Sequence, residues 1–190
     1  MLRFDLSDHS RLRLLEESDA GELFALIEAN RAHLSRWLPW ASAQDAEGTL
    51  EFIRGTRGGA ADRTGFTFAI VCDDALTGVI GLEPIDWTHR TASIGYWLGE
   101  GQQGRGTMTR AVRALVEHAG TVLELNRIEI RAAVGNARSR AIPERLGFRE
   151  EGTLRQAERV GGTYLDIVVY SLVGPSELTA AARRGRRSGR

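Results

Sequence analysis

Four glycines fall within eight residues, at Gly99, Gly101, Gly104 and Gly106. Without a Cβ, the backbone at such positions can approach a bound group closely. The apolar spacing after Thr107 predicts a helix, whose first N–H groups have no partner within the helix and share the positive end of its dipole. Such N–H groups bind anions, most often phosphate. The pattern therefore predicts a site for a phosphate-bearing ligand at the start of this helix.

The residues around these glycines narrow the choice of ligand. A Walker A loop ends in Gly-Lys-Ser or Gly-Lys-Thr, and the chain contains no lysine. A dinucleotide-binding turn has a third glycine where this chain has Thr109. The segment Gln103–Met108 instead follows the pattern Gln/Arg-x-x-Gly-x-Gly/Ala at the head of a helix, with Met108 in place of the usual small residue. An ordinary strand-to-helix turn without a ligand is the alternative.

A second motif lies downstream, where Asn136 and Ser139 precede the triplet Leu146-Gly147-Phe148. Together the two motifs resemble the GNAT superfamily of N-acetyltransferases, in which the first motif is the acetyl-CoA pyrophosphate loop. The resemblance spans roughly residues 12–173. Further similarity, to the branch of ribosomal-protein-alanine and ribosomal-protein-serine N-acetyltransferases, lies in segments 30–40, 94–98 and 162–166.

The resemblance implies an enzyme that moves an acetyl group from acetyl-CoA to a primary amine, without a metal. Strands 91–98 and 127–134 are expected to lie parallel and to separate beyond Leu98, so that the backbone of 96–98 binds pantetheine and holds the acetyl carbonyl. Asn136 is expected to hydrogen-bond the pantetheine amides and to cap the helix that follows it. The residues expected to bind acetyl-CoA are Tyr96, Trp97, Leu98, Gln103, Gly104, Arg105, Gly106, Thr107, Met108, Thr109, Asn136 and Ser139.

Two proton transfers accompany acetyl transfer to an amine. By resemblance, the hydroxyl of Ser139 supplies a proton to the departing thiolate, and Glu158 matches a glutamate proposed as the base. Many members of the superfamily place a base where this chain has Ser93, so a water chain to bulk solvent is an alternative to Glu158. The chain offers no credible nucleophile, which favours direct transfer in a ternary complex.

The acceptor is expected to be a protein N-terminal α-amine or a small-molecule amine. Residues expected at the acceptor mouth are His33, Trp37, Trp40 and Tyr164. Packing of an amphipathic helix face is an equally good explanation for His33 and Trp37. Because Ser93 replaces the usual base, a second hypothesis is a non-catalytic acyl-CoA-binding sensor or scaffold module.

Composition excludes several other classes. The single cysteine forbids an internal disulfide, and the four histidines lack metal-ligand spacing. No apolar run is long enough to span a membrane, so a cytoplasmic location without membrane partners is expected. Five of the 25 basic residues lie at 183–190, which leaves 20 basic against 25 acidic residues in the body and disfavours DNA binding. The family likeness is compatible with a homodimer.

The resemblance implies the α/β (α+β) GNAT fold: one mixed, mostly antiparallel twisted sheet with a splayed parallel strand pair and helices on both faces, and the periodicities predict the individual strands and helices. We expect an acetyltransferase domain at 1–174 and a disordered arginine-rich tail at 175–190, with RNA binding by the tail as a weaker alternative. Residues 1–10 are expected to be irregular. Pro143, inside a predicted helix, should bend or shorten that helix. Strands are expected at 11–15, 65–72, 77–85, 91–98, 127–134, 148–154 and 164–172, and helices at 18–30, 45–57, 107–119 and 136–146.

Overall fold

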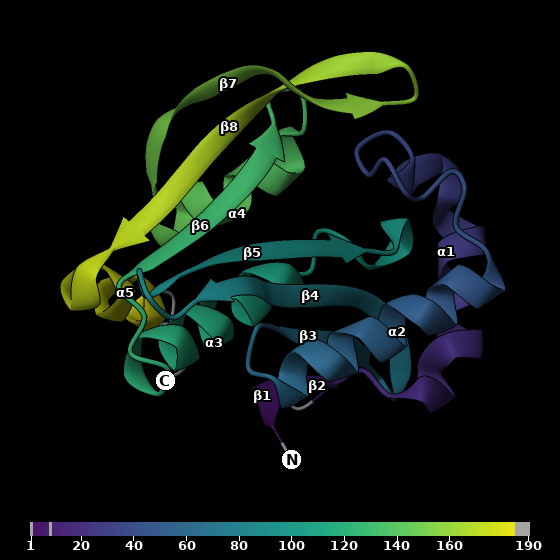
Figure 1. The fold of residues 1–190 in the computed structure, drawn as a ribbon, viewed down its shortest axis with the longest axis horizontal. Helices are drawn as coiled ribbons and strands as arrows, with labels where there is room; N and C mark the ends of the chain where they lie inside the picture. The colour runs from purple at the N-terminus through teal and green to yellow at the C-terminus, as the bar shows by residue number, and fades with distance from the viewer. Residues whose placement is uncertain (1, 8, 185–190) are drawn as a thin grey trace.

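Eight strands form one mixed sheet in this computed structural model, which describes residues 2–7 and 9–184 (Figure 1). The strand order is β1-β2-β3-β4-β5-β6-β8-β7, and every neighbouring pair is antiparallel except β5 and β6. The strands are β1 (Arg3–Ser7), β2 (Ser10–Leu14), β3 (Phe66–Cys72), β4 (Ala75–Asp86), β5 (Thr91–Leu98), β6 (Arg127–Ala133), β7 (Arg149–Val160) and β8 (Thr163–Val173).

Helices cover both faces of the sheet, because the central strands alternate apolar side chains toward each face. In β3, Phe68 and Ile70 join the core beneath α3, whereas Ala69 and Val71 join a second core with α1 and α2. The helices are α1 (Ala20–Leu34), α2 (Ala46–Ala61), α3 (Thr107–Thr121), α4 (Ala137–Leu146) and α5 (Gly174–Arg183). The sequence prediction of a mixed sheet with helices on both faces is confirmed.

The two ends of the chain are more regular than the sequence predicted. The expected irregular lead-in contains β1, which pairs with β2. The expected tail begins with α5, so the prediction of disorder from 175 is wrong for 175–183. In α5, Leu178, Ala181 and Ala182 are buried, and Leu178 packs against Gly120 of α3. These small and apolar residues supply a helix face that the arginine-rich composition obscured. The remaining tail, 185–190, lies outside the described residues.

The hairpin of β7 and β8 also differs from the prediction. The two strands are joined by Gly161 and Gly162 alone, which both have positive φ, instead of by a long loop. The extra residues expected in the loop form a bulge in β7, where the register jumps from Leu154 to Glu158. The hairpin consequently extends as a long arm beyond the body of the sheet (Figure 1).

Strands β5 and β6 are parallel, as predicted, but they separate earlier than expected. Only Thr91, Ala92 and Ser93 of β5 have partners in β6. Beyond Ser93, β5 follows β4 as far as Leu98, while β6 follows β8. The prediction of separation beyond Leu98 is therefore wrong by five residues. The twist between neighbouring strands moves the two halves of the sheet apart, because each strand keeps its antiparallel neighbour (Figure 1). Among the described residues, no helix has the length and apolar character needed to cross a membrane.

Candidate active site

The glycine-rich loop enters α3 with a backbone suited to an anion. Gly104 and Gly106 have φ of +80° and +73°, a region that favours glycine. Gly106 is the N-cap of α3 and has no side chain with which to cap the helix, and the first turn contains no acidic residue. The first N–H groups of α3 therefore remain available to a bound phosphate.

Side chains beneath the loop hold this backbone in place. Met108 and Thr107 are buried, so the bulky Met108 side chain lies in the core. Arg110 folds back and donates to the Arg105 carbonyl and to Thr107 Oγ1, both at 3.2 Å. Thr109 Oγ1 accepts from Arg145 of α4 at 2.8 Å. The departure at Met108 thus leaves the ligand-facing backbone unobstructed.

Gln103, the first residue of the loop motif, connects the loop to two helices. Its Nε2 lies 2.8 Å from Nε2 of His33 in α1, and its Oε1 accepts from Arg138 of α4 at 2.7 Å. The Glu100 N–H, just before the loop, donates to Asn30 Oδ1 at 2.8 Å. The structure therefore places His33 against the loop, whereas the sequence analysis had expected it at the mouth through which the acceptor enters.

Asn136 and Ser139 lie at the start of α4, which follows β6. Asn136 is the N-cap, and its Oδ1 accepts the Ser139 N–H at 3.2 Å. From β5, the Tyr96 hydroxyl donates to the Ser139 carbonyl at 3.0 Å, and Ser139 Oγ donates to the Tyr96 oxygen at 3.4 Å. Burial raises the pKa of Tyr96, although the hydrogen bond with Ser139 opposes that effect. Side chains thus link β5 to α4 beyond the point at which β5 and β6 separate.

Carboxylates near the separated strands differ in how strongly they are held. Glu158 of β7 is half-buried and pairs with Leu165 through the backbone, but its carboxylate forms no hydrogen bond or ion pair with any side chain that the structure describes, Ser139 included. Glu129 pairs in register with Ser93, the position without the usual base. Burial alone would raise the pKa of Glu129, but hydrogen bonds from Arg127 and Arg131 outweigh it and lower that pKa. Glu129 is therefore held as a structural anion, whereas the Glu158 carboxylate has no such partner.

Two of the predicted acceptor residues flank the separated strands. The Trp37 ring lies 3.5 Å from the position that a Cβ on Gly135, just after β6, would take. The Trp40 ring lies 6.1 Å from that of Trp97 in β5, centroid to centroid. The segment between α1 and α2 thus contacts both arms. Tyr164 of β8 is exposed, and the Arg159 guanidinium lies over its ring.

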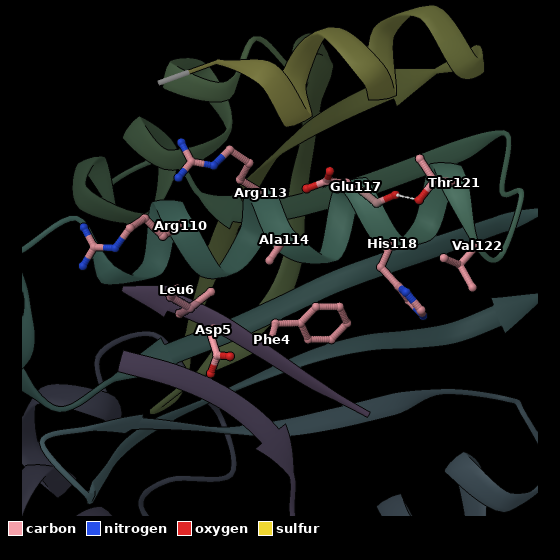
Figure 2. Close-up of a pocket in the computed structure, with 10 residues that line it drawn as sticks. All are labelled: Phe4, Asp5, Leu6, Arg110, Arg113, Ala114, Glu117, His118, Thr121 and Val122. Carbon is pink, nitrogen blue, oxygen red and sulfur yellow. Dashed lines mark hydrogen bonds between the residues drawn. The ribbon is translucent and has the colours of Figure 1, made fainter. Parts of the chain in front are cut away.

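Two hollows of similar size lie beside α3. One of about 450 Å³ runs between β1 and α3 and is lined by residues such as Phe4, Arg113 and His118 (Figure 2). It does not include the loop, Asn136 or Ser139. The other, of about 440 Å³, includes Arg105 and Thr107 and therefore reaches the loop. Among the described residues, no three His, Cys, Asp or Glu side chains gather as a metal site would require.

The comparisons with known proteins point in one direction. A family model described as "Acetyltransferase (GNAT) domain" matches residues 10–149. The putative ribosomal N-acetyltransferase YdaF of Bacillus subtilis is 41% identical over 91% of this chain and 96% of its own length. The ribosomal-protein-serine acetyltransferase of Escherichia coli is 34% identical over 90% of this chain and 97% of its own length.

A solved structure agrees with these sequence relatives. The ribosomal L7/L12 α-N-protein acetyltransferase RimL, in complex with coenzyme A, superposes with a TM-score of 0.88 at 29% identity. The match covers 92% of this chain and 99% of that one.

Proposed function

Because this chain belongs to the family of GNAT acetyltransferases, and is an acetyl-CoA-dependent N-acetyltransferase, we propose that its acceptor is the α-amino group of a ribosomal protein. The family, the fold and acetyl-CoA as co-substrate were each predicted from the sequence, and these predictions are confirmed. An acceptor on the ribosome agrees with the expected cytoplasmic location. Two relatives that match nearly their whole length carry ribosomal acceptors in their names, which supports this proposal.

One observation carries the assignment of the site. Strands β5 and β6 pair over three residues only and then separate beside the N-terminus of α3. The unpaired edge of β5, over Tyr96–Leu98, supplies backbone groups that bind the pantetheine amides as an added strand would. The loop N–H groups at Gly104–Met108 bind the pyrophosphate. Acetyl-CoA fits here because glycine leaves the loop open and no acidic side chain occupies the first turn.

The proposed chemistry is direct transfer between two bound substrates. The amine nitrogen attacks the thioester carbonyl carbon, the C–S bond breaks, and the thiolate takes a proton from Ser139 Oγ. The attacking nitrogen, which is positively charged once it has bonded to carbon, loses one proton as the amide forms, and this proton restores the Ser139 hydroxyl directly or through water. Backbone N–H groups of β5 stabilise the negative oxygen that forms on the way. The acceptor ammonium loses its proton to Glu158 or through water, since Glu129 is held by Arg127 and Arg131.

The acceptor enters between Trp37 and Trp40, which contact the two separated arms. A peptide N-terminus presents its α-amine on a narrow chain, so it can pass between flat aromatic walls. His33 does not face the acceptor in this proposal. It binds Gln103 and so helps to hold the loop that binds acetyl-CoA. Tyr164 and Glu158 belong to the hairpin arm, on which the following peptide residues would lie.

An acceptor panel tests the proposal. The panel contains a serine-initiated peptide with an internal lysine, the same peptide with a blocked N-terminus, and spermidine. Coenzyme A release is followed as free thiol, and the product is located by fragmentation mass spectrometry. We expect acetylation of the free peptide at its α-nitrogen only.

Turnover confined to spermidine or to the lysine side chain would reject a protein α-amine as the acceptor. Tight acetyl-CoA binding without thiol release from any amine would favour the sensor hypothesis. A stable acetyl-enzyme on the route to product would reject direct transfer.

A further inference from the structure

We propose that Tyr96 is a positioning residue for the acetyl transfer reaction and that it acts through Ser139. Its hydroxyl donates a hydrogen bond to the Ser139 carbonyl, which lacks a helical donor because Pro143 has no N–H. The proposal rests on the proposed role of Ser139 as the proton donor. It gives a role to the side chain of Tyr96, of which only the backbone was assigned so far, and it accounts for the proline inside α4.

The first step is the position of Pro143 relative to Ser139. In an α-helix, each N–H donates to the carbonyl four residues earlier. The residue four after Ser139 is Pro143, which has no N–H, and α4 continues past it to Leu146. The Ser139 carbonyl therefore lacks its ordinary helical donor. Ser139 is partly buried, and a carbonyl shielded from water without a donor is costly, so a substitute is expected.

The second step is that Tyr96 supplies that substitute from the other arm. Its hydroxyl donates to the Ser139 carbonyl at 3.0 Å. Because a phenol has one proton, its oxygen is then left as an acceptor toward Ser139 Oγ, at 3.4 Å. Asn136 holds the N–H of the same residue. Ser139 is thus held at its N–H, its carbonyl and its hydroxyl.

The third step is the proton balance. Ser139 Oγ gives its proton to the thiolate when the C–S bond breaks, and a proton must then return to Oγ. Tyr96 is a poor source for that proton, since its own is bound to a carbonyl and burial raises its pKa. The returning proton therefore comes, directly or through solvent, from the attacking nitrogen, which loses one proton as the amide forms. Tyr96 fixes the position of the Ser139 oxygen and the spacing between β5 and α4, and its charge does not change. The single Ser139 hydroxyl proton turns from Tyr96 toward the thiolate when it is given up.

A second tyrosine provides a matched control. Tyr170 of β8 is buried, and its hydroxyl also binds α4, accepting from Arg140 Nε and donating to Glu144 Oε1, both at 2.8 Å. It has no hydrogen bond to Ser139. Loss of either hydroxyl therefore removes an anchor of the same helix, but only Tyr96 reaches the proposed proton donor.

The experiment compares Y96F, Y170F, S139A and Y96F/S139A, with whichever amine the wild-type enzyme acetylates. We expect Y96F to lower kcat about tenfold, with less than a twofold change in coenzyme A affinity. S139A should lower kcat by ~10²-fold, the lower end for general acid catalysis. The double variant should be no slower than S139A, because Tyr96 acts through Ser139. Y170F should lower thermal stability and keep kcat. Additive losses in the double variant, or equal losses in Y170F and Y96F, would overturn the proposal.

Pro143→Ala separates positioning from stability. In Y96F the Ser139 carbonyl has neither donor, so the melting temperature should fall. Y96F/P143A restores a helical N–H at residue 143 and should recover that melting temperature while kcat stays low. Recovery of kcat together with stability would show that Tyr96 only supports the fold. An inactive wild-type enzyme would reject the proposed function itself. A fully active S139A beside a slow Y96F would reject the route through Ser139.

Discussion

Gln103 Nε2 lies 2.8 Å from His33 Nε2, and this contact determines the tautomer of the neutral histidine ring, that is, which ring nitrogen carries the hydrogen. Arg138 can only donate, so the Gln103 oxygen must face it and the Gln103 amide NH₂ must face His33. His33 Nε2 is then the acceptor, and the ring proton lies on Nδ1, 3.8 Å from Glu100 Oε1.

His33→Ala should weaken coenzyme A binding about three- to tenfold, because it removes one hydrogen bond that orients the first residue of the loop. Calorimetric titration with coenzyme A measures the effect. The control is His89→Ala, since the His89 side chain is exposed and lies in the turn between β4 and β5. Equal affinity in H33A and wild type would show that Gln103 needs no support from α1.

The tautomer of His33 is a separate prediction. Nitrogen-15 NMR of the ligand-free enzyme at pH 8 should show the proton of this ring on Nδ1. A proton on Nε2 would reverse the assigned direction of the contact, and with it the orientation of the Gln103 amide.

Gly106→Val should weaken coenzyme A binding at least tenfold. The φ of +73° is strained for any residue with a Cβ, and a Cβ there would lie 3.1 Å from Arg110 Nη1. Gly101→Val is the control, because the space around Gly101 is open and its φ is not in the left-handed region. If coenzyme A bound to both variants as tightly as to the wild type, the loop would not be the pyrophosphate site.

The sequence predicted the site best where backbone conformation carries the chemistry. The glycines predicted a loop backbone that a bound group can approach closely, and Gly104 and Gly106 have the positive φ that only glycine adopts readily. Asn136 was predicted as a helix cap and is the N-cap of α4. Tyr96 and Ser139 are 43 residues apart, and no periodic pattern connects them. Pro143 was the available signal, since its missing N–H points to the carbonyl of Ser139. Which side chain supplies the missing donor depends on how far β5 and β6 separate, and the twist of the whole sheet determines that distance.

The ends of the fold escaped prediction for a different reason. Residues 3–7 alternate polar and apolar types over only five residues, a short run that the sequence analysis did not take as a strand, and they pair with β2 at the edge of the sheet. In α5, arginine and alanine mask a narrow apolar face that needs α3 to cover it. Tertiary contacts decide both elements, so local composition misled.

Leu178→Ala tests the correction at α5. The side chain is 1% exposed and packs on Gly120, so its loss should cost ~2–5 kcal/mol of unfolding free energy. Urea denaturation measures this cost. Leu154→Ala is the control, because Leu154 is 42% exposed and its loss should change stability by less than about 0.5 kcal/mol. A small effect of L178A would mean that α5 does not pack on α3 in solution.

Acid should destabilise the sheet through Glu151 of β7. Hydrogen bonds from Arg127, and then from Ser171, lower the pKa of Glu151 from its ordinary 4.5 to about 2. A lowered folded-state pKa means that the carboxylate stabilises the fold above pH 4.5 and that this contribution is lost as the pH falls toward about 2. In Glu151→Gln, the urea midpoint should fall less steeply across this window. Parallel pH curves for E151Q and wild type would contradict the assignment.

The central claim is that acetyl-CoA lies between the separated arms of β5 and β6, with its pyrophosphate on the loop. Hydrogen–deuterium exchange with and without coenzyme A tests it most directly. We expect new protection at the amides of 94–98 and 104–108, and none at the β1 and α3 residues that line the hollow in Figure 2. Protection confined to that hollow, with unchanged exchange in β5 and the loop, would contradict the account.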